Sequence, residues 1–222
     1  MNANRGNGRE RNAPPPPIVG TGMTTSFAVT WDYRCPFARN AHDHLVSALQ
    51  AGGDWDVTFL AFSLDQPHVE AGEPSVFDQP DRYPGLLANE VGIVVRDRQP
   101  ESFLDVHHAL FEARHGGAAD LRKRDIIAPI LVANGVDPAS VWAEIDDGWP
   151  LETHRKEHTT LADNLSVFGV PTFIVGDDAT FIRLLNRAAG DTDLATRTIT
   201  RIVDLLTGWP ELNEFKHTTV PV

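Results

Sequence analysis

The sequence predicts an α/β fold in which one sheet is interrupted once by a helical insertion. Three observations predict it. A strand, a helix and a second strand follow one another near the start of the chain. Roughly 90 to 100 residues of helical pattern without a strand come next, and this is the size of a subdomain. Two short strands and a helix then close the chain, which completes an α/β unit.

Composition and charge narrow the class of protein. The 222 residues are 41% hydrophobic and 23% charged, which is typical of a folded globular chain with its own core. The net charge of -12 repels phosphate backbones and anionic lipid surfaces, so we expect neither a nucleic acid nor a membrane as partner. The longest apolar run, Ile126–Ala133, is far shorter than the roughly 20 residues of a membrane span.

The first residues differ from the rest of the chain. Residues 1–22 lack periodicity and are rich in Asn, Gly and Pro, so we expect a disordered, solvated tail. They contain no apolar stretch of the kind that a secretion signal needs, which predicts a cytoplasmic protein. Thiols are mostly reduced in that compartment, and Cys35 is the single cysteine of the chain. It is therefore a free or a catalytic thiol.

Residues 23–66 predict a βαβ unit. The nearly continuous apolar and β-favouring run Ser26–Tyr33 indicates a strand buried on both faces. A helix is expected from Pro36 to about Ala51, with Cys35 at its N-cap, because small and apolar residues recur on one stripe: Ala38, Ala41, Leu45, Ala48 and Leu49. Alternation over Trp55–Leu64 indicates a second strand, which the intervening helix should make parallel to the first.

Residues 67–165 form the predicted insertion. The proline-rich stretch 65–99 is irregular, and its short apolar segment Val91–Val95 is ambiguous between strand and helix. Helical patterns bounded by Gly, Pro or Asp follow one another after it: Pro100–His115, Asp120–Asn134, Asp137–Asp147 and Pro150–Leu165.

Residues 166–222 predict a hairpin and a final helix. Residues 169–175 indicate a strand opened by a proline, residues 176–178 a turn, and residues 179–184 the partner strand. The last helix should run from Thr192 to about Thr207, because Gly208 and Pro210 follow its apolar stripe. Together with the first strands, this segment would complete one sheet.

The N-cap position gives Cys35 a chemical interpretation. The side chain there faces the unpaired N–H groups of the first helical turn, where the helix dipole stabilises a thiolate. Such a cysteine has a lowered pKa and is nucleophilic, and Arg34 and Arg39 lie close enough in sequence to add positive potential. The alternative is that Cys35 is simply a small buried hydrophobic residue.

The chain resembles the DsbA family of thioredoxin-fold oxidoreductases over about 200 residues. The residues that carry the resemblance are Asp32-Tyr33 ending a strand, Cys35-Pro36-Phe37-Ala38 opening a helix, and Gly169-Val170-Pro171-Thr172 entering a strand. Within that family the chain resembles more closely the cytosolic, actinobacterial and polyketide-associated branch, which shares its architecture with kappa-class glutathione transferases and 2-hydroxychromene-2-carboxylate isomerases. The resemblance implies a thioredoxin-like fold with an all-helical insertion.

The resemblance also implies roles for individual residues. Cys35 would be the attacking thiolate, Pro36 and Phe37 the dipeptide that tunes it, and Pro171 a cis-proline facing the sulfur. Only the resemblance predicts the cis form, because about 5 to 6% of X-Pro bonds in folded proteins adopt it. Unpaired backbone groups of Val170 and Thr172 would then hold an extended substrate as an added strand.

The chain departs from the family where a second cysteine would stand. That position is Ala38, and with one cysteine an intramolecular disulfide is impossible. Monothiol chemistry remains: Cys35 forms a mixed disulfide that an external thiol, glutathione or mycothiol, must release. We expect disulfide oxidoreductase or isomerase activity on a protein or small-molecule disulfide, no permanently bound cofactor, and a monomer or homodimer. Two alternatives are a kappa-type transferase or isomerase that binds a thiol non-covalently, and a binding module without catalysis.

Other polar residues have two interpretations each. Arg183 and Arg187 could hold a carboxylate of a bound thiol, although a solvated, charge-balancing role is favoured. His154 and His158 are spaced for one metal ion, yet their apolar stripe favours core packing, so no metal site is predicted. Four further histidines are expected to be surface or satisfied polar residues: His42, His44, His107 and His108. Aromatic residues could line a groove over the thiol, although most should be core: Phe62, Phe103, Phe111, Trp142, Trp149 and Phe168.

Overall fold

The structure of the chain is a computed structural model, and it describes residues 24–214 and 216–217. The predicted tail, residues 1–22, lies outside the described residues. Within them, no helix combines the length and the apolar character that a membrane span requires. The division of the chain at residues 66 and 165 stays a prediction.

The sheet has the order β2-β1-β3-β4. Strands β1 (Thr25–Trp31) and β2 (Trp55–Ala61) are parallel, as predicted, and pair from Thr25 with Trp55 to Trp31 with Ala61. Strand β3 (Thr172–Val175) is antiparallel to β1 and forms the predicted hairpin with β4 (Asp178–Phe181). The apolar sequence of β1 reflects its central position, because its side chains point to both faces of the sheet and helices cover those faces. The α/β fold class, with one sheet interrupted by a helical insertion, is confirmed.

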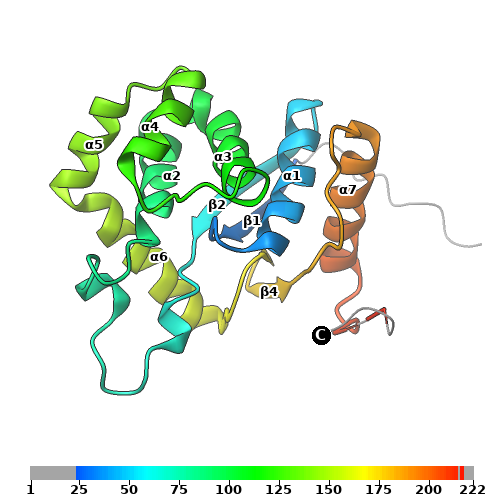
Figure 1. Ribbon diagram of the computed structural model, residues 1–222. Coiled ribbons are helices and arrows are strands. Elements are labelled where there is room, and N and C mark those ends of the chain that lie inside the picture. The colour runs from blue at the N-terminus through cyan, green and yellow to red at the C-terminus, as the bar shows by residue number, and fades with distance from the viewer. Residues whose placement is uncertain (1–23, 215, 218–222) are drawn as a thin grey trace, which may run out of the picture.

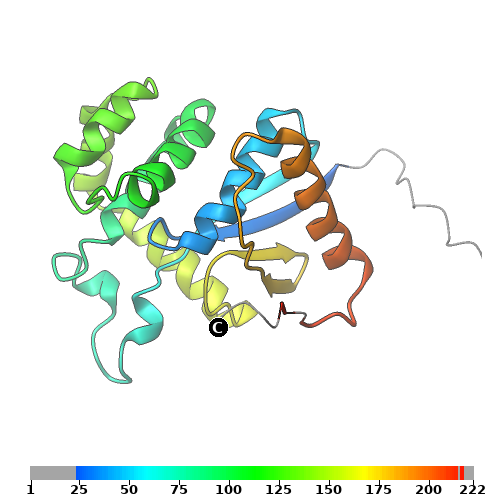
Figure 2. The same ribbon diagram turned by 45° about the vertical axis from the view of Figure 1, so that its right-hand side comes forward.

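Helices cover the sheet on both faces. Helix α1 (Pro36–Gln50) lies side by side with α7 (Thr192–Gly208) in both views, and the two helices are in contact (Figures 1 and 2). Helix α6 (Trp149–Leu165) runs along the other side of the sheet and contacts β2. The first turn of α1 begins directly after the loop that leaves β1, which places Cys35 at the carboxyl end of a central strand.

The insertion forms a helical lobe beside the sheet, drawn in green in Figure 1. Its helices pack on one another and on α6: α2 (Leu86–Arg98), α3 (Pro100–His115), α4 (Arg124–Ala133) and α5 (Pro138–Asp147). Two short 3₁₀ turns, Gln66–His68 and Val76–Asp78, lead into the lobe. Helix α3 also contacts α1, so the lobe is joined directly to the helix that carries Cys35.

Several predicted bounds are corrected. The ambiguous segment Val91–Val95 lies inside α2, a helix buried along most of its length. Helix α4 begins at Arg124 and not at Asp120, because the Asp120 carboxylate accepts hydrogen bonds from Arg122 in a local turn. Strands β1 and β2 end at Trp31 and Ala61, two and three residues before the predicted ends, where the chain turns toward the candidate site.

Candidate active site

Cys35 caps the N-terminus of α1, as predicted. Its backbone is extended, with φ of -86° and ψ of 119°, and its Sγ accepts a hydrogen bond from the Ala38 N–H at 3.4 Å. The Cys35 N–H donates to the Asp32 carbonyl at 3.0 Å, which fixes the loop between β1 and α1. Pro36 fits the first helical turn because it needs no N–H partner there. The sulfur therefore lies at the positive end of the helix.

The loop before β3 lies against the sulfur. The Val170–Pro171 peptide bond is cis, and the Cys35 thiol donates to the Val170 carbonyl at 3.2 Å. The Thr172 N–H donates to the Thr30 hydroxyl at 2.9 Å. The expectation of unpaired backbone groups at Val170 and Thr172 is therefore wrong for this carbonyl and this N–H, since both have partners within the chain.

Burial sets the ionisation of the thiol. Cys35 is only 7% exposed, and desolvation raises its pKa above the ordinary value. The N–H groups of Ala38 and Phe37 lower the pKa, the Asp32 carboxylate raises it, and Arg183 lowers it, but burial is the largest cause. The prediction of a depressed pKa is therefore wrong for this structure: burial favours the protonated thiol, whose S–H group is placed to donate to the Val170 carbonyl.

The two arginines expected to help the thiolate are held elsewhere. Arg34 pairs with Asp32 and with Asp65, each at 2.7 Å. Arg39 binds Glu112 through two nitrogens, at 2.9 and 2.8 Å. Carboxylates at such short range offset the guanidinium charges, so neither arginine adds a free positive charge beside the sulfur.

Arg183 and Phe37 border the site together. The Arg183 guanidinium carbon lies 5.0 Å from the centre of the Phe37 ring, in a cation–π contact. Arg183 is exposed, and no carboxylate among the described residues pairs with it. Arg187, in contrast, pairs with Glu112 at 2.7 Å. Of the two arginines considered for a ligand carboxylate, Arg183 is the one that remains accessible.

His154 and His158 pack in the core beneath β2, which agrees with the interpretation favoured from the sequence. The His158 Nδ1 accepts from the Ser63 N–H at 3.2 Å, and the His154 ring lies edge-on to Phe77 at 5.0 Å between centres. Burial lowers their pKa values to about 3 for His154 and about 4 for His158. Both rings are therefore neutral near pH 7.

A buried histidine pair behind the site was not predicted. His42 and His107 are 1% and 0% exposed, so the surface alternative is wrong and the satisfied-polar alternative is right. His107 Nδ1 lies 2.7 Å from the Tyr33 hydroxyl, and its Nε2 lies 2.9 Å from His42 Nδ1. This row of hydrogen bonds ends at the Thr30 carbonyl, 3.0 Å from His42 Nε2. The stripe that predicted α1 contained the signal, because position 42 falls one turn after Ala38.

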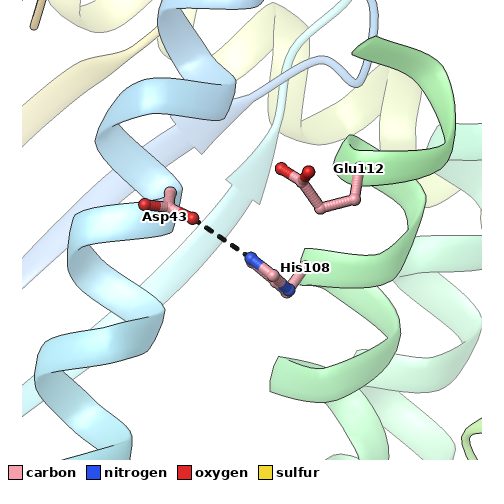
Figure 3. Close-up of side chains that lie close together, drawn as sticks. All are labelled: Asp43, His108 and Glu112. Atoms are coloured by element: carbon pink, nitrogen blue, oxygen red, sulfur yellow. Dashed lines mark hydrogen bonds and ion pairs between the residues drawn. The ribbon is translucent and has the colours of Figure 1, made fainter. Parts of the chain in front are cut away.

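A second group of titratable side chains lies between α1 and α3. Asp43 and His108 are 3.1 Å apart and Glu112 lies one turn further along α3 (Figure 3). Their ligand atoms are within 4.8 Å of one another, which is close enough for one metal ion. Arg39 and Arg187 both bind Glu112, however, so two positive charges oppose a cation here. The donor set fits an ion-pair network that joins the insertion to α1 better than it fits a metal centre.

The aromatic residues divide as expected. Phe62, Phe103 and Phe111 are buried in the main core, and Trp142 and Trp149 are partly buried against it. Phe168 differs, because 69% of it is exposed and its ring contacts Phe181 at 5.2 Å between centres.

The sequence model of the DSBA-like thioredoxin domain matches residues 29–187, which include Cys35, the insertion and Pro171. The chain belongs to the DSBA-like thioredoxin domain family. No curated protein sequence matches it. Proteins of this family are generally thiol–disulfide oxidoreductases, and isomerases are among its structural relatives.

Solved structures of low sequence identity share this DSBA-like fold. A 2-hydroxychromene-2-carboxylate isomerase superposes with a TM-score of 0.57 at 14% identity, over 82% of this chain and 98% of its own. DsbA of Pseudomonas aeruginosa gives 0.53 at 19% identity, over 88% and 90%. The cytosolic disulfide reductase DsbM of the same organism, solved with GSH, gives 0.54 at 16% identity, over 81% and 100%.

Proposed function

We propose that this DSBA-like protein carries out thiol–disulfide exchange by a monothiol mechanism through Cys35. The observation that carries the proposal is one sulfur at the start of α1, 3.2 Å from the Val170 carbonyl, with Ala38 where a second thiol would stand. The substrate would be a protein or small-molecule disulfide, and glutathione or mycothiol would serve as co-substrate. A reducing, cytoplasmic compartment would supply that thiol.

The chemistry balances in two exchange steps. The Cys35 thiolate attacks one sulfur of a disulfide RS–SR′, the S–S bond breaks, and R′S⁻ leaves with the electron pair. A second thiolate then attacks the R sulfur of the mixed disulfide, and Cys35 leaves as a thiolate. The pair of steps returns the protein unchanged, and no second cysteine is required.

The resting site must change before the first step. The thiol donates to the Val170 carbonyl and its pKa is raised, so its proton must pass to water or to the leaving thiolate. An extended substrate backbone that took the Val170 carbonyl as its own acceptor would remove the partner of the S–H group. Substrate binding and activation of Cys35 would then be coupled.

A second candidate function is supported by the same hydrogen bond from the Cys35 thiol to the Val170 carbonyl. A protonated Cys35 could donate a hydrogen bond to a thiol cofactor, and a transferase or isomerase reaction would use that cofactor. The raised pKa of Cys35 and its 7% exposure favour this candidate.

Mass spectrometry distinguishes the two functions. The chain is incubated with oxidised glutathione, and separately with mycothiol disulfide, and the intact mass is measured with Cys35→Ser as the matched control. We expect an adduct of one thiol on the parent chain and none on the control. Tight binding without an adduct would favour the cofactor function, and neither an adduct nor binding would favour a module without catalysis.

A second test concerns Arg183. If this exposed side chain holds a ligand carboxylate, Arg183→Gln should raise the concentration of oxidised glutathione needed for half-maximal adduct formation. The maximal rate should fall by a smaller factor, because the Arg183 charge is the smallest of the named influences on the pKa of Cys35. An equal effect of Arg197→Gln, an exposed arginine on α7, would argue against a specific contact.

A further inference from the structure

A cavity of about 560 Å³ lies directly beside the loop that carries Cys35. Tyr33 and Arg34 form one wall, the segment from Arg82 to Ala88 forms a second, and the connection between α3 and α4 forms the third. The thioredoxin-like part and the insertion therefore both contribute. This volume falls in the range of about 300 to 1,000 Å³ that small-molecule sites occupy.

Four arginines line the cavity, and two of them are compensated. Arg34 pairs with Asp65 at 2.7 Å, and Arg122 pairs with Asp120 at 2.6 Å. Both of these carboxylates also belong to the lining. These pairs fix the shape of the cavity but contribute little net charge.

The other two arginines have no carboxylate partner. Neither Arg82 nor Arg114 forms an ion pair with any residue that the structure describes, and both are exposed. The Arg82 guanidinium lies over the Tyr83 ring at 5.6 Å and 3.5 Å from the Gln79 side-chain oxygen, contacts that leave its charge uncompensated. The lining therefore carries an excess of two positive charges in a chain whose net charge is -12.

The N-terminus of α2 opens into the same cavity. Its N-cap, Gly85, has no side chain, the first turn contains no acidic residue, and the Leu86 and Leu87 N–H groups donate to the Tyr83 and Pro84 carbonyls. Gly85 and Ala88 both line the cavity. The helix dipole therefore adds to the positive potential of the arginines, and both features favour an anion.

We propose that this cavity binds a small organic anion through carboxylate or phosphate groups held by Arg82 and Arg114. Guanidinium groups bind both kinds of anion with paired hydrogen bonds. A concave site of this volume fits a small molecule, and the strongly negative net charge of the chain opposes a polyanion. The site goes beyond the proposed thiol exchange, because binding here requires no chemistry at Cys35.

The test measures binding by calorimetry to the full chain carrying Cys35→Ser. The probes are oxidised glutathione, inorganic phosphate and the uncharged bis(2-hydroxyethyl) disulfide. We expect at least one anionic probe to bind and the uncharged disulfide not to bind. Binding of glutathione disulfide alone would assign the site to carboxylates, and binding of phosphate would assign it to phosphoryl groups.

Three variants locate the site. Arg82→Gln and Arg114→Gln should each raise the dissociation constant about tenfold, since a hydrogen-bonded charge is lost. Arg201→Gln, an exposed arginine on α7 remote from the cavity, should leave it unchanged. Equal binding of the uncharged disulfide, no binding of either anion, or equal effects of all three variants would overturn the proposal. Since Cys35 is absent in every arm, failure of the proposed exchange reaction would not affect the result.

Discussion

The buried hydrogen-bond network that joins Tyr33, His107, His42 and Thr30 can be tested most directly, and His107→Phe is the perturbation. The direction of each hydrogen bond follows from the end of the chain. The Thr30 carbonyl can only accept, so His42 carries its proton on Nε2 and accepts on Nδ1. His107 must then donate from Nε2 and accept on Nδ1 from the Tyr33 hydroxyl.

The size of the destabilisation follows from the two hydrogen-bonding groups that the substitution leaves without a partner. His107→Phe leaves the Tyr33 hydroxyl and the His42 Nδ1 without partners in the core, and each unpaired buried group costs about 1 to 3 kcal/mol. We expect a loss of about 2 to 6 kcal/mol in the free energy of unfolding. For a chain of this size that corresponds to a fall in Tm of roughly 4 to 24 °C.

Urea denaturation of Tyr33→Phe and of the double variant Tyr33→Phe/His107→Phe separates this effect from a packing defect. Tyr33→Phe/His107→Phe leaves only the His42 Nδ1 without a partner, so we expect the double variant to be more stable than His107→Phe alone. A simple defect in packing would make the double variant less stable than either single variant. The reasoning is refuted if His107→Phe unfolds within about 0.5 kcal/mol of the parent chain, or if the two effects add.

Three other predictions follow from burial in the same region. The rate at which iodoacetamide alkylates Cys35, measured by mass spectrometry, should be lower at pH 7 than for a free thiol and should increase at pH values above about 8.5. A midpoint of this pH profile well below about 8.5 would contradict the raised pKa. Gly92→Ala would place its Cβ 2.6 Å from the Tyr33 hydroxyl oxygen, so it should lower the free energy of unfolding, measured by urea denaturation, by about 1 to 3 kcal/mol. An unchanged urea midpoint would show that the Tyr33 ring moves freely. Burial lowers the pKa of His42 to about 4, so the neutral ring should contribute up to about 3 kcal/mol to the free energy of unfolding above pH 6.5. This contribution should be lost as the pH falls from 6.5 through about 4. Urea midpoints that stay constant from about pH 7 to 4.5 would argue against it.

The sequence predicted the elements whose pattern reports one buried face. Helices α1 and α7 each bury a regular stripe, and their periodicity was sufficient to place them. Strand β1 was placed instead by its nearly continuous apolar run. Helix α2 escaped prediction because it packs against α3, α5 and α6 and is buried on nearly every side. Its sequence therefore has no polar face to set a period of 3.6 residues.

The position of Cys35 was predictable, but the electrostatics around it were not. A proline after the cysteine and an apolar stripe are local signals, and they place the sulfur at the N-cap of α1. The partners of the nearby arginines are distant in sequence: Asp65 lies 31 residues from Arg34, and Glu112 lies 73 residues from Arg39. Pairing at such separations depends on the tertiary fold, so proximity to Cys35 in sequence overstated the positive charge at the sulfur.

The raised pKa has a consequence for a protein with a single thiol. Two backbone N–H groups favour the Cys35 thiolate, but desolvation at 7% exposure outweighs them. An exposed thiolate without a second cysteine would form mixed disulfides with any available disulfide and could not release them by itself. Under the proposed mechanism, a buried thiol hydrogen-bonded to Val170 would avoid this, because exchange near neutral pH would require a ligand that opens that contact. Under the proposed mechanism, specificity would therefore arise from the ligand that displaces the Val170 carbonyl, and the rate of exchange should depend on the substrate backbone more strongly than on its disulfide.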